Sequence, residues 1–512
     1  MISNIKTISL NGIEGNLVEV QTDISGGLPN FDIVGLPDTS VRESKERIRA
    51  AIKNSNIEFP SRKIIINLAP ASTKKEGTSY DLPMAIGILV ALGEIIDNSL
   101  DNTVFLGELS LDGKINKING VLPMCIEALN LGIKKIIIPK DNEKEAAVVE
   151  NLEIIGVRNL KEVVDFLNKE IEIQATKIDI LNMFKKEDKQ DIDFSEVKGQ
   201  ENARRALEIA AAGGHNCILI GPPGSGKTMI AKRIPTILPD LTFEESLEVT
   251  KIHSISGMLD SNIGIITKRP FRNPHHTITP FSMIGGGKIP KPGEISLAHN
   301  GVLFLDELPE FNRNTLEILR GPLEDRNVTI SRLYSKVKYP CNFMLIASMN
   351  PCPCGYYGST EKECQCSKLS IEKYLNRISG PLLDRIDLHV EVKTVKYNKL
   401  DSNCYAESSK QIKERVNYAR KIQYSRYKNL SIFSNSELTP KMISQFCVLD
   451  VESKKILEMA FNKLGFSARA YSRILKVART IADLEGKDNI NKIHLAEAIQ
   501  YRSLDRKYGD KF

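Results

Sequence analysis

The spacing of hydrophobic positions changes along the chain and separates regions of different type. In residues 1–170, short apolar runs at 104–106 and 135–138 alternate with helix-like spacing at 41–54 and 82–93. Strands and helices that alternate within a stretch of this length are typical of a compact α+β domain.

Residues 171–193 end in an almost entirely polar stretch, and we interpret them as a linker. Residues 194–392 form a second region. Its apolar strands, each ending at polar residues, are 217–220, 302–305 and 343–347. Strands that are apolar throughout are typical of a parallel sheet covered by helices on both faces. Residues 393–512 show helical spacing with few strand signals, so the sequence predicts an α/β multidomain protein that ends in a helical domain.

Length and composition agree with a soluble multidomain chain. With 512 residues, of which 41% are hydrophobic and 26% charged, the chain is too long for one core and ordinary in composition. The N-terminus lacks the apolar core of a signal peptide, and residues 84–96 fall short of the ~20 that a bilayer requires. We therefore expect a cytoplasmic protein with no membrane partner.

The net charge of +6 is unevenly distributed. From Lys393 onward, Lys and Arg outnumber Asp and Glu by 24 to 13. An acidic partner such as nucleic acid and an ordinary solvated helical surface explain this excess equally well.

A glycine-rich motif follows the apolar strand 217–220. It reads GPPGSGKT and comprises Gly221, Pro222, Pro223, Gly224, Ser225, Gly226, Lys227 and Thr228. Between a strand and a helix, this pattern predicts a phosphate-binding loop for ATP. Lys227 is expected to reach the β- and γ-phosphates, and the Thr228 hydroxyl is expected to ligate Mg²⁺.

Two further strands end at residues suited to ATP hydrolysis. Strand 302–305 leads into Asp306 and Glu307. Asp306 is expected to hold the Mg²⁺ shell, and Glu307 to orient and polarise the attacking water. Asn350, after the next strand, suits a contact with the γ-phosphate or the water, although it could instead cap a turn before Pro351.

Together GPPGSGKT, LFLDE, Asn350 and GPLLDRID resemble an AAA+ ATPase. The resemblance implies that Arg385, in GPLLDRID, is an arginine finger for the ATP of a neighbouring subunit; a salt bridge with Asp384 or Asp387 is the alternative. It also implies that Arg469, in the lid helix, senses the nucleotide state, with Arg473 one turn later as the competing residue.

Two insertions interrupt the predicted core. The first contains PFRNPHH and is expected to form an added loop or hairpin; its basic residues are Arg269, Arg272, His275, His276 and Lys288. The magnesium-chelatase-like branch of AAA+ proteins has a similar segment, which favours phosphate contacts in a central pore over a merely rigid turn. The second, residues 328–340, alternates like a hairpin with Arg332, Lys336 and Lys338 as its basic side chains. It resembles the hairpin that faces the pore in helicase members of this branch; a solvated edge hairpin is the alternative.

Two other segments carry candidate chemistry. Residues 415–428 interleave Tyr418, Tyr424 and Tyr427 with five basic residues, which suits either nucleic-acid binding or helix packing. Cys352, Cys354, Cys364 and Cys366 form two C-x-C pairs in one loop, which predicts either a structural Zn²⁺ site or four reduced thiols.

The N-terminal region resembles the proteolytic domain of Lon-type proteases over KKEGTSYDLPMAIGIL and GVLPMCIEALNLGIKKIIIP. Ser79 falls near the place of the nucleophilic serine, but Leu122 stands where the family has its catalytic lysine. A serine without a base is not activated. We therefore expect a Lon-like fold without peptidase activity.

Nearly the whole chain resembles the ComM/YifB family of magnesium-chelatase-like ATPases. The resemblance implies a hexameric ring that moves along DNA and drives branch migration in recombination or natural transformation. The alternatives are a chelatase-type motor that inserts Mg²⁺ into a porphyrin, an ATP-dependent protease, and a protein-remodelling ring.

Overall fold

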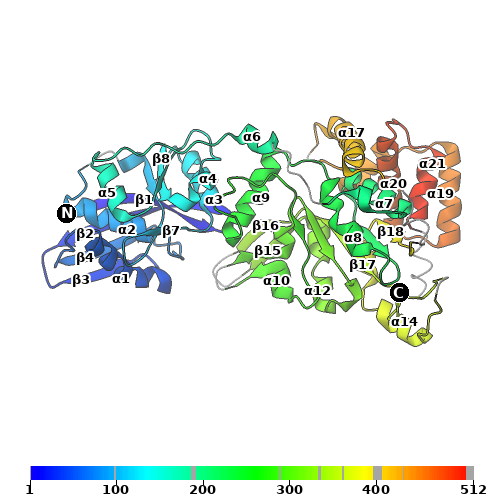
Figure 1. Ribbon diagram of the computed structural model, residues 1–512, viewed down its shortest axis with the longest axis horizontal. Helices are drawn as coiled ribbons and strands as arrows, with labels where there is room; N and C mark the ends of the chain where they lie inside the picture. The colour runs from blue at the N-terminus through cyan, green and yellow to red at the C-terminus, as the bar shows by residue number, and fades with distance from the viewer. Residues whose placement is uncertain are drawn as a thin grey trace.

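The computed structural model describes residues 2–96, 100–185, 192–287, 290–331, 336–359, 362–395, 406–430 and 432–502. The N-terminal domain lies at one end of the long axis, the helical lid at the other, and the second α/β domain between them (Figure 1).

The N-terminal domain is built on a mixed seven-stranded sheet. Its strand order is β3 (Asn30–Val34), β4 (Lys63–Ala69), β2 (Glu14–Ser25), β1 (Ile2–Asn11), β5 (Thr103–Phe105), β8 (Lys135–Pro139) and β9 (Glu153–Val157). A short hairpin, β6 (Glu108–Leu109) and β7 (Ile115–Asn116), follows β5. The helices are α1 (Thr39–Asn54), α2 (Asp81–Leu92), α3 (Val121–Asn130), α4 (Glu143–Ala146) and α5 (Leu160–Leu167).

Helix α2 is the centre of this domain. It is apolar around its whole circumference, and ten of its twelve residues are buried, so it is held by packing on every side rather than along one stripe. It ends at Gly93, whose φ of 82° closes the helix in the left-handed conformation. The short α6 (Ile180–Lys185) then leads towards the second domain.

The second domain has a five-stranded sheet in which every pair is parallel. The order is β11 (Phe271–Arg272), β14 (Val302–Leu305), β17 (Met344–Met349), β10 (Cys217–Ile220) and β18 (Leu388–Glu391). The residues of β10, β14 and β17 are all buried, because helices cover both faces. The helices are α7 (Glu201–Gly213), α8 (Lys227–Lys232), α9 (Phe243–Ser256), α10 (Pro280–Ile284), α11 (Glu294–Leu297), α12 (Arg313–Glu317), α13 (Arg320–Asp325), α14 (Lys368–Leu375) and α15 (Gly380–Leu383).

The two insertions differ from each other in structure. Part of the PFRNPHH segment is not an added loop: Phe271 and Arg272 form β11, the edge strand of the core sheet, because they pair with Val302 and Leu303. A small hairpin of β12 (Gly285–Gly286) and β13 (Lys291–Pro292) follows. The second insertion forms the predicted hairpin, β15 (Asn327–Ser331) and β16 (Lys336–Pro340).

The C-terminal region is helical, with α17 (Ser409–Tyr427), α18 (Pro440–Phe446), α19 (Val451–Leu464), α20 (Ala468–Leu484) and α21 (Lys492–Gln500). Its apolar residues share one buried cluster with α7, β10 and β18 of the core. The buried Asp387, next to β18, also forms an ion pair with Arg473 of α20. The observed parallel sheet, helical lid and N-terminal domain confirm the predicted fold class.

The N-terminal domain is joined to the core through α9. The buried Glu145 accepts hydrogen bonds from the Leu122 backbone N–H, at 2.9 Å, and from the Ser254 hydroxyl of α9. The Gly120 N–H donates to the Ser254 carbonyl at 3.2 Å, and Lys117 Nζ donates to the Leu259 carbonyl at 2.6 Å. We call this set of contacts the α9 joint. Among the described residues, no helix is long and apolar enough to cross a membrane.

Candidate functional site

The phosphate loop lies between β10 and α8, as a loop that must wrap around phosphates requires. Gly224 and Gly226 have φ values of 75° and 88°, which lets the backbone turn so that the N-terminus of α8 faces the loop. Lys227 Nζ donates to the carbonyls of Gly221 and Pro222, both at 2.8 Å. Burial lowers the pKa of Lys227, and the nearby Asp306 and Glu307 carboxylates oppose this effect.

The predicted metal ligands meet directly. The Thr228 hydroxyl donates to Asp306 Oδ2 at 2.7 Å, and the Ser348 hydroxyl of β17 donates to Asp306 Oδ1. Asp306 follows β14, and β17 lies beside it in the sheet. The two oxygens on Thr228 and Asp306 are the donor type that Mg²⁺ prefers, so they could hold the ion together with bound phosphates. Sequence reasoning missed Ser348, which lies inside a strand and carries no motif.

Glu307 is held in an unusual backbone conformation beside this pair. Its φ is 53°, and its N–H donates to Asp306 Oδ1 at 3.1 Å. A non-glycine residue in the left-handed region costs free energy and is common at functional sites. The side chain is 60% exposed, and His276 Nδ1 lies 3.9 Å from its Oε2. His276 was predicted to contact phosphate in a pore, but here it lies beside the residue predicted to polarise water.

Asn350 follows β17 and comes close to the phosphate loop. Its Oδ1 accepts a hydrogen bond from Lys227 Nζ at 3.1 Å. Gln200 Nε2 donates to the Ser225 carbonyl at 3.1 Å and lines a cavity of about 270 Å³ beside the loop. No sequence motif marks Gln200, which reaches the loop only through the fold.

Arg385 is packed within its own subunit. It is 6% exposed, and its guanidinium donates to the carbonyls of Arg320 and Pro381 at 3.1 and 2.7 Å. Its third contact is an ion pair with Glu324, at 2.6 Å. Within the subunit, Arg385 therefore pairs with Glu324 and not with Asp384 or Asp387, the two partners suggested by the sequence.

The two candidate sensor arginines of α20 lie in different surroundings. Arg473 is paired with the buried Asp387. Arg469 is 59% exposed and lies 3.9 Å from Asp384. Arg473 is therefore occupied with joining the lid to the core, whereas Arg469 is open to solvent.

Most of the arginines in the basic segments are paired within the chain. Arg272 forms a bidentate pair with Glu294 at 2.6 and 2.7 Å, and Arg269 binds Glu245 and the Pro239 and Asn300 carbonyls. Such contacts suit a structural role rather than phosphate binding. His275 stays exposed, its ring 4.1 Å from that of His276; Lys288 and Arg332 lie outside the described residues.

The hairpin β15–β16 alternates as predicted. Val337 and Tyr339 are buried, whereas Lys336 and Lys338 point outward and are exposed.

In residues 415–428 the outcome is mixed: Tyr418 and Tyr424 are exposed, but Tyr427 is 1% exposed. The three arginines of that helix are paired within the chain. Arg415 binds Glu407 and Glu208. Arg420 binds the Ala211 carbonyl, and Arg426 binds Asp483.

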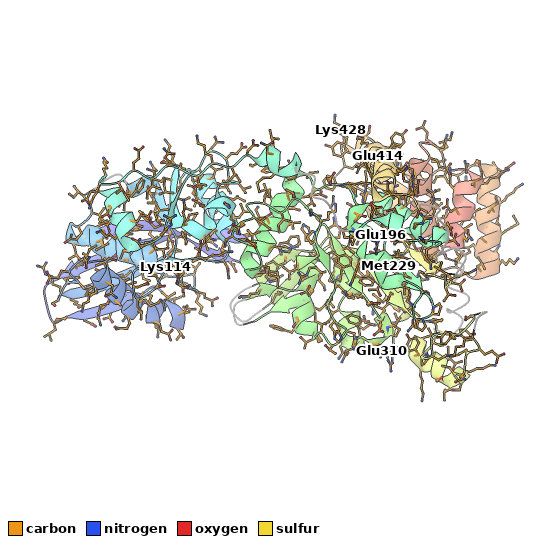
Figure 2. All side chains as sticks on the ribbon, in the orientation of Figure 1. Lys114, Glu196, Met229, Glu310, Glu414 and Lys428 are labelled. Atoms are coloured by element: carbon orange, nitrogen blue, oxygen red, sulfur yellow. The ribbon has the colours of Figure 1, made fainter. Side chains whose placement is uncertain are left out.

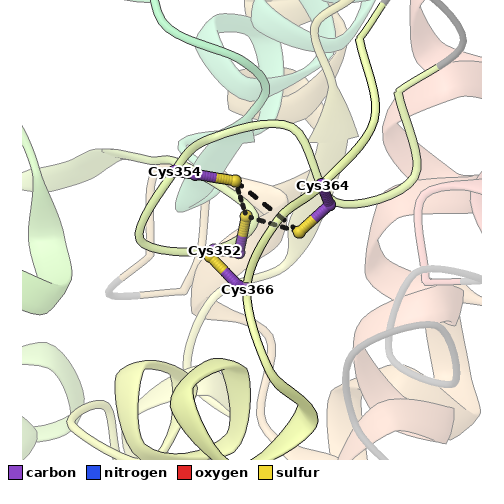
Figure 3. A group of neighbouring side chains, drawn as sticks. All are labelled: Cys352, Cys354, Cys364 and Cys366. Atoms are coloured by element: carbon purple, nitrogen blue, oxygen red, sulfur yellow. Dashed lines mark hydrogen bonds between the residues drawn. The ribbon is translucent and has the colours of Figure 1, made fainter.

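The four cysteines of the loop after β17 converge (Figure 3). All four Sγ atoms lie within 4.8 Å of one another; Cys352 Sγ is 3.3 Å from Cys354 Sγ and 3.6 Å from Cys364 Sγ. Tetrahedral zinc with Zn–S bonds of about 2.3 Å places its sulfur atoms about 3.8 Å apart, so the four thiolates fit that ion. A Cβ on Gly355 would overlap Cδ of Pro223, so this loop packs on the phosphate loop.

In the N-terminal domain, Leu122 and Lys75 of the Lon-like segments are both buried. Leu122 is fully buried in an apolar cluster, with its N–H bound to Glu145. The buried Lys75, in the loop before Ser79, donates its amine hydrogens to the carbonyls of Pro70 and Thr73. These hydrogen bonds connect the Lys75 amine to the backbone of its own loop.

Comparison with known proteins agrees with this arrangement. Residues 193–400 match the family described as magnesium chelatase, subunit ChlI; residues 20–142 match subunit ChlI of Mg-chelatase, and residues 406–502 match its C-terminal family. The chain is 44% identical to the uncharacterized protein YifB of Escherichia coli, over 99% of this chain and 98% of that protein. It is 43% identical to the competence protein ComM of Haemophilus influenzae, over 97% and 96%.

A further relative, Lon protease 2 of Bacillus subtilis, is 29% identical over 30% of each chain. The nucleotide motifs, the parallel sheet with its helical lid and the full-length similarity all indicate the same family. The chain belongs to the ComM/YifB family of magnesium-chelatase-like AAA+ ATPases.

Proposed function

We propose that this protein is an ATP-driven motor that acts on DNA and remodels branched DNA in recombination or natural transformation. The β15–β16 hairpin carries the DNA part of the proposal, because Lys336 and Lys338 project from one face of it while its apolar face is buried. Two lysines on the exposed face of a hairpin suit contact with phosphates. The basic excess after Lys393 and the similarity to a competence protein support the same partner.

The hydrolysis step follows from the side chains around the phosphate loop. Lys227 and Asn350 are placed to contact the γ-phosphate. Thr228 and Asp306 would hold Mg²⁺, which would neutralise the charge that develops on the phosphate during hydrolysis. Glu307 accepts a proton from the water that attacks the γ-phosphorus, and ADP leaves. The lysine now bound to Gly221, Pro222 and Asn350 exchanges these oxygens for phosphate when ATP enters.

A second subunit completes the site in this proposal. Arg385 approaches the ATP of a neighbour in a ring, for which a hexamer is the expected form, and Arg469 reports the nucleotide state to the lid. Arg385 must then exchange Glu324 for the neighbour's γ-phosphate. Arg385→Ala should keep ATP binding and lose most hydrolysis, whereas Arg377→Ala, an exposed arginine paired with Glu310, should leave hydrolysis close to wild type.

The test of the function is ATP hydrolysis with and without single-stranded, duplex and four-way-junction DNA. We expect at least one DNA to stimulate hydrolysis, and Lys336→Ala/Lys338→Ala to reduce that stimulation while the basal rate remains. An absence of stimulation by every DNA, together with no salt-sensitive binding, would remove the DNA role and leave a chelatase-type or protein-remodelling motor.

The cysteine loop is proposed to hold a structural Zn²⁺ through Cys352, Cys354, Cys364 and Cys366. Bound zinc would stabilise a loop that packs on Pro223 and follows Asn350. We expect about one zinc per chain in purified protein, and its loss in Cys352→Ser. Cys341→Ser, at a buried cysteine outside this group, should keep the metal. Zinc-free wild-type protein would contradict the assignment.

A further inference from the structure

The N-terminal domain has a polar cleft whose lining includes neither residues of the nucleotide site nor Ser79. The cleft has a volume of about 660 Å³. Its charged lining residues are Lys114, Lys140, Arg158, Lys161, Asp112 and Asp141, and the rest of the lining is three asparagines, one serine and one isoleucine. Figure 2 shows Lys114 on the N-terminal domain, far along the long axis from Met229 in helix α8 of the core.

The place of this cleft in the fold suits a ligand. Strands β5, β8 and β9 run parallel, and the chain segments that follow each of them supply cleft residues. Ligands of open sheets bind at the carboxyl ends of parallel strands, where loops of different strands come together. The cleft therefore lies where a sheet of this type presents side chains to a ligand.

The cleft carries an excess of positive charge. Lys114, Arg158 and Lys161 are exposed, and among the described residues no carboxylate forms an ion pair with any of the three. Lys140 differs, because Glu143 lies 2.6 Å from its amine. The N-terminus of helix α5, which contains Lys161, is capped by Asn159, and the Glu162 carboxylate in its first turn accepts a hydrogen bond from the Arg158 N–H at 2.6 Å.

Two carboxylates face the same cleft. Asp112 accepts a hydrogen bond from the Lys114 backbone N–H at 3.1 Å, which orients it within its own loop. Asp141 belongs to the turn that follows β8. Four cationic side chains against two carboxylates leave the lining with a net positive charge.

The backbone holds the cationic residues of different segments together. Lys114 and Asn159 form an isolated antiparallel bridge. The Ile115 N–H donates to the Arg158 carbonyl, and the Leu160 N–H donates to the Gly113 carbonyl, both at 2.8 Å. The backbone therefore fixes the positions of Lys114 and Arg158 relative to each other, although their like-charged side chains repel.

We propose that this cleft binds consecutive phosphates of a nucleic-acid backbone. Its lining offers cations, amides and one hydroxyl, and it contains no aromatic side chain on which a base could stack. This chemistry suits phosphate and sugar rather than a nucleobase. The inference rests on the proposed action on DNA and adds a second contact, on the N-terminal domain, to that of the β15–β16 hairpin.

The test compares DNA binding by the full chain and two triple variants, using fluorescent duplex and four-way-junction DNA at several salt concentrations. Lys114→Ala/Arg158→Ala/Lys161→Ala should weaken binding about tenfold and lower the slope of log affinity against log salt by about 1–3, since each phosphate contact contributes about 0.9. Arg42→Ala/Arg62→Ala/Lys63→Ala removes the same charge from exposed positions outside the cleft and should leave both quantities near wild type. ATP hydrolysis without DNA should be equal in all three proteins.

The outcomes separate this inference from the proposed function. If the wild-type chain binds no DNA, the proposed function fails, and the cleft assignment fails with it. If the wild type binds but the two triple variants behave alike, only the cleft assignment is wrong. A last comparison adds inorganic phosphate or chloride at equal ionic strength. If phosphate displaces more DNA than chloride does, and only from proteins with an intact cleft, the cleft binds a small phosphate ligand and the backbone assignment is wrong.

Discussion

In the AAA+ core the side chains of separate motifs meet at one edge of the sheet, whereas in the N-terminal domain the position expected for a Lon-type lysine is a buried leucine. Thr228 and Asp306 are in direct contact, and Lys227 reaches Asn350. Leu122, by contrast, is buried among apolar neighbours. A shared fold therefore carries chemistry only where the reactive groups themselves are kept.

Around Leu122 the N-terminal domain makes contacts with the ATPase core. The backbone of Leu122 binds Glu145, and the same carboxylate binds Ser254 of the ATPase core. The turn between β1 and β2 also packs against the β15–β16 hairpin, since a Cβ on Gly12 would overlap Val337. Both contacts connect the N-terminal domain to the ATPase core.

The strongest test of the contrast is Glu307→Gln in the core. A glutamine cannot accept the proton of the attacking water, so kcat should fall about 10²- to 10⁴-fold while ATP binding persists. Steady-state hydrolysis and nucleotide affinity measure the two effects separately. Glu310→Gln, three residues later and paired with Arg377, is the matched control and should hydrolyse ATP normally. Normal turnover by Glu307→Gln would show that another residue polarises the water.

A second variant, Asp387→Asn, removes a buried charge that connects the core to the helical lid. Asp387 is 5% exposed and contacts Arg473, His215 and the Asn216 N–H. Loss of one partner from a buried ion pair costs about 3–5 kcal/mol, so the lid should detach at lower temperature or denaturant concentration. Asp384→Asn, next to the exposed Arg469, should cost about 1 kcal/mol or less.

The pH dependence of this pair has a definite sign. Burial opposes ionisation, but Arg473 and His215 together with Lys476 lower the pKa of Asp387 below its ordinary value of 3.8. A carboxyl whose pKa is lower in the folded state stabilises the fold above the unfolded-state pKa, and this stability is lost as the pH falls below about 3.8. Asp387→Asn should lack this part of the acid sensitivity; denaturation curves measured between pH 3 and 7 on both proteins would reveal it, and equal acid sensitivity would contradict the assignment.

These cases also show how far the sequence alone could reach. Parallel strands that end in polar residues predicted that Lys227, Thr228, Asp306 and Asn350 belong to one site, because the carboxyl ends of such strands share an edge. The partners of surface charges could not be read in the same way. Arg415 binds Glu208, which is 207 residues away in the chain, and charge counts along a segment carry no information about such distant pairs.

The position of His276 beside Glu307 was equally hidden from the sequence. It depends on β11 joining the edge of the sheet, a two-residue strand too short to show a hydrophobic period. The same limit applies to Arg385, whose contact with Glu324 is set by the packing of α13 rather than by its own motif. Motifs identify the chemistry, and tertiary structure decides which neighbour each side chain uses.

A smaller effect is expected at the α9 joint. Ser254→Ala removes one donor to the buried Glu145, and the folded state should lose about 1–3 kcal/mol near neutral pH. Burial raises the pKa of Glu145, against hydrogen bonds from Ser254, Leu122 and Asn142. Without Ser254 the protonated form is favoured further, so the loss should shrink as the pH falls and Glu145 becomes neutral.

Hydrogen exchange of α3 and α9 measures this effect locally. Ser256→Ala, on the same helix but bonded only to the His253 carbonyl at 2.8 Å, should leave the exchange of α3 unchanged. Faster exchange of α3 in both variants would mean that the helix itself, and not the joint, has been weakened.

The smallest effect is predicted for Ser79→Ala, which tests the contrast from the side of the N-terminal domain. Leu122 stands where the Lon family has its catalytic lysine, and the amine of the buried Lys75 is bound to two carbonyl oxygens. We therefore expect the Ser79 hydroxyl to lack an activating base. Wild type and variant should show the same ATP hydrolysis and no cleavage of unfolded protein or fluorescent peptides. Cleavage by the wild type that disappears in Ser79→Ala, with the melting temperature unchanged, would show that this domain kept its reaction and that packing at Leu122 is no guide to lost activity.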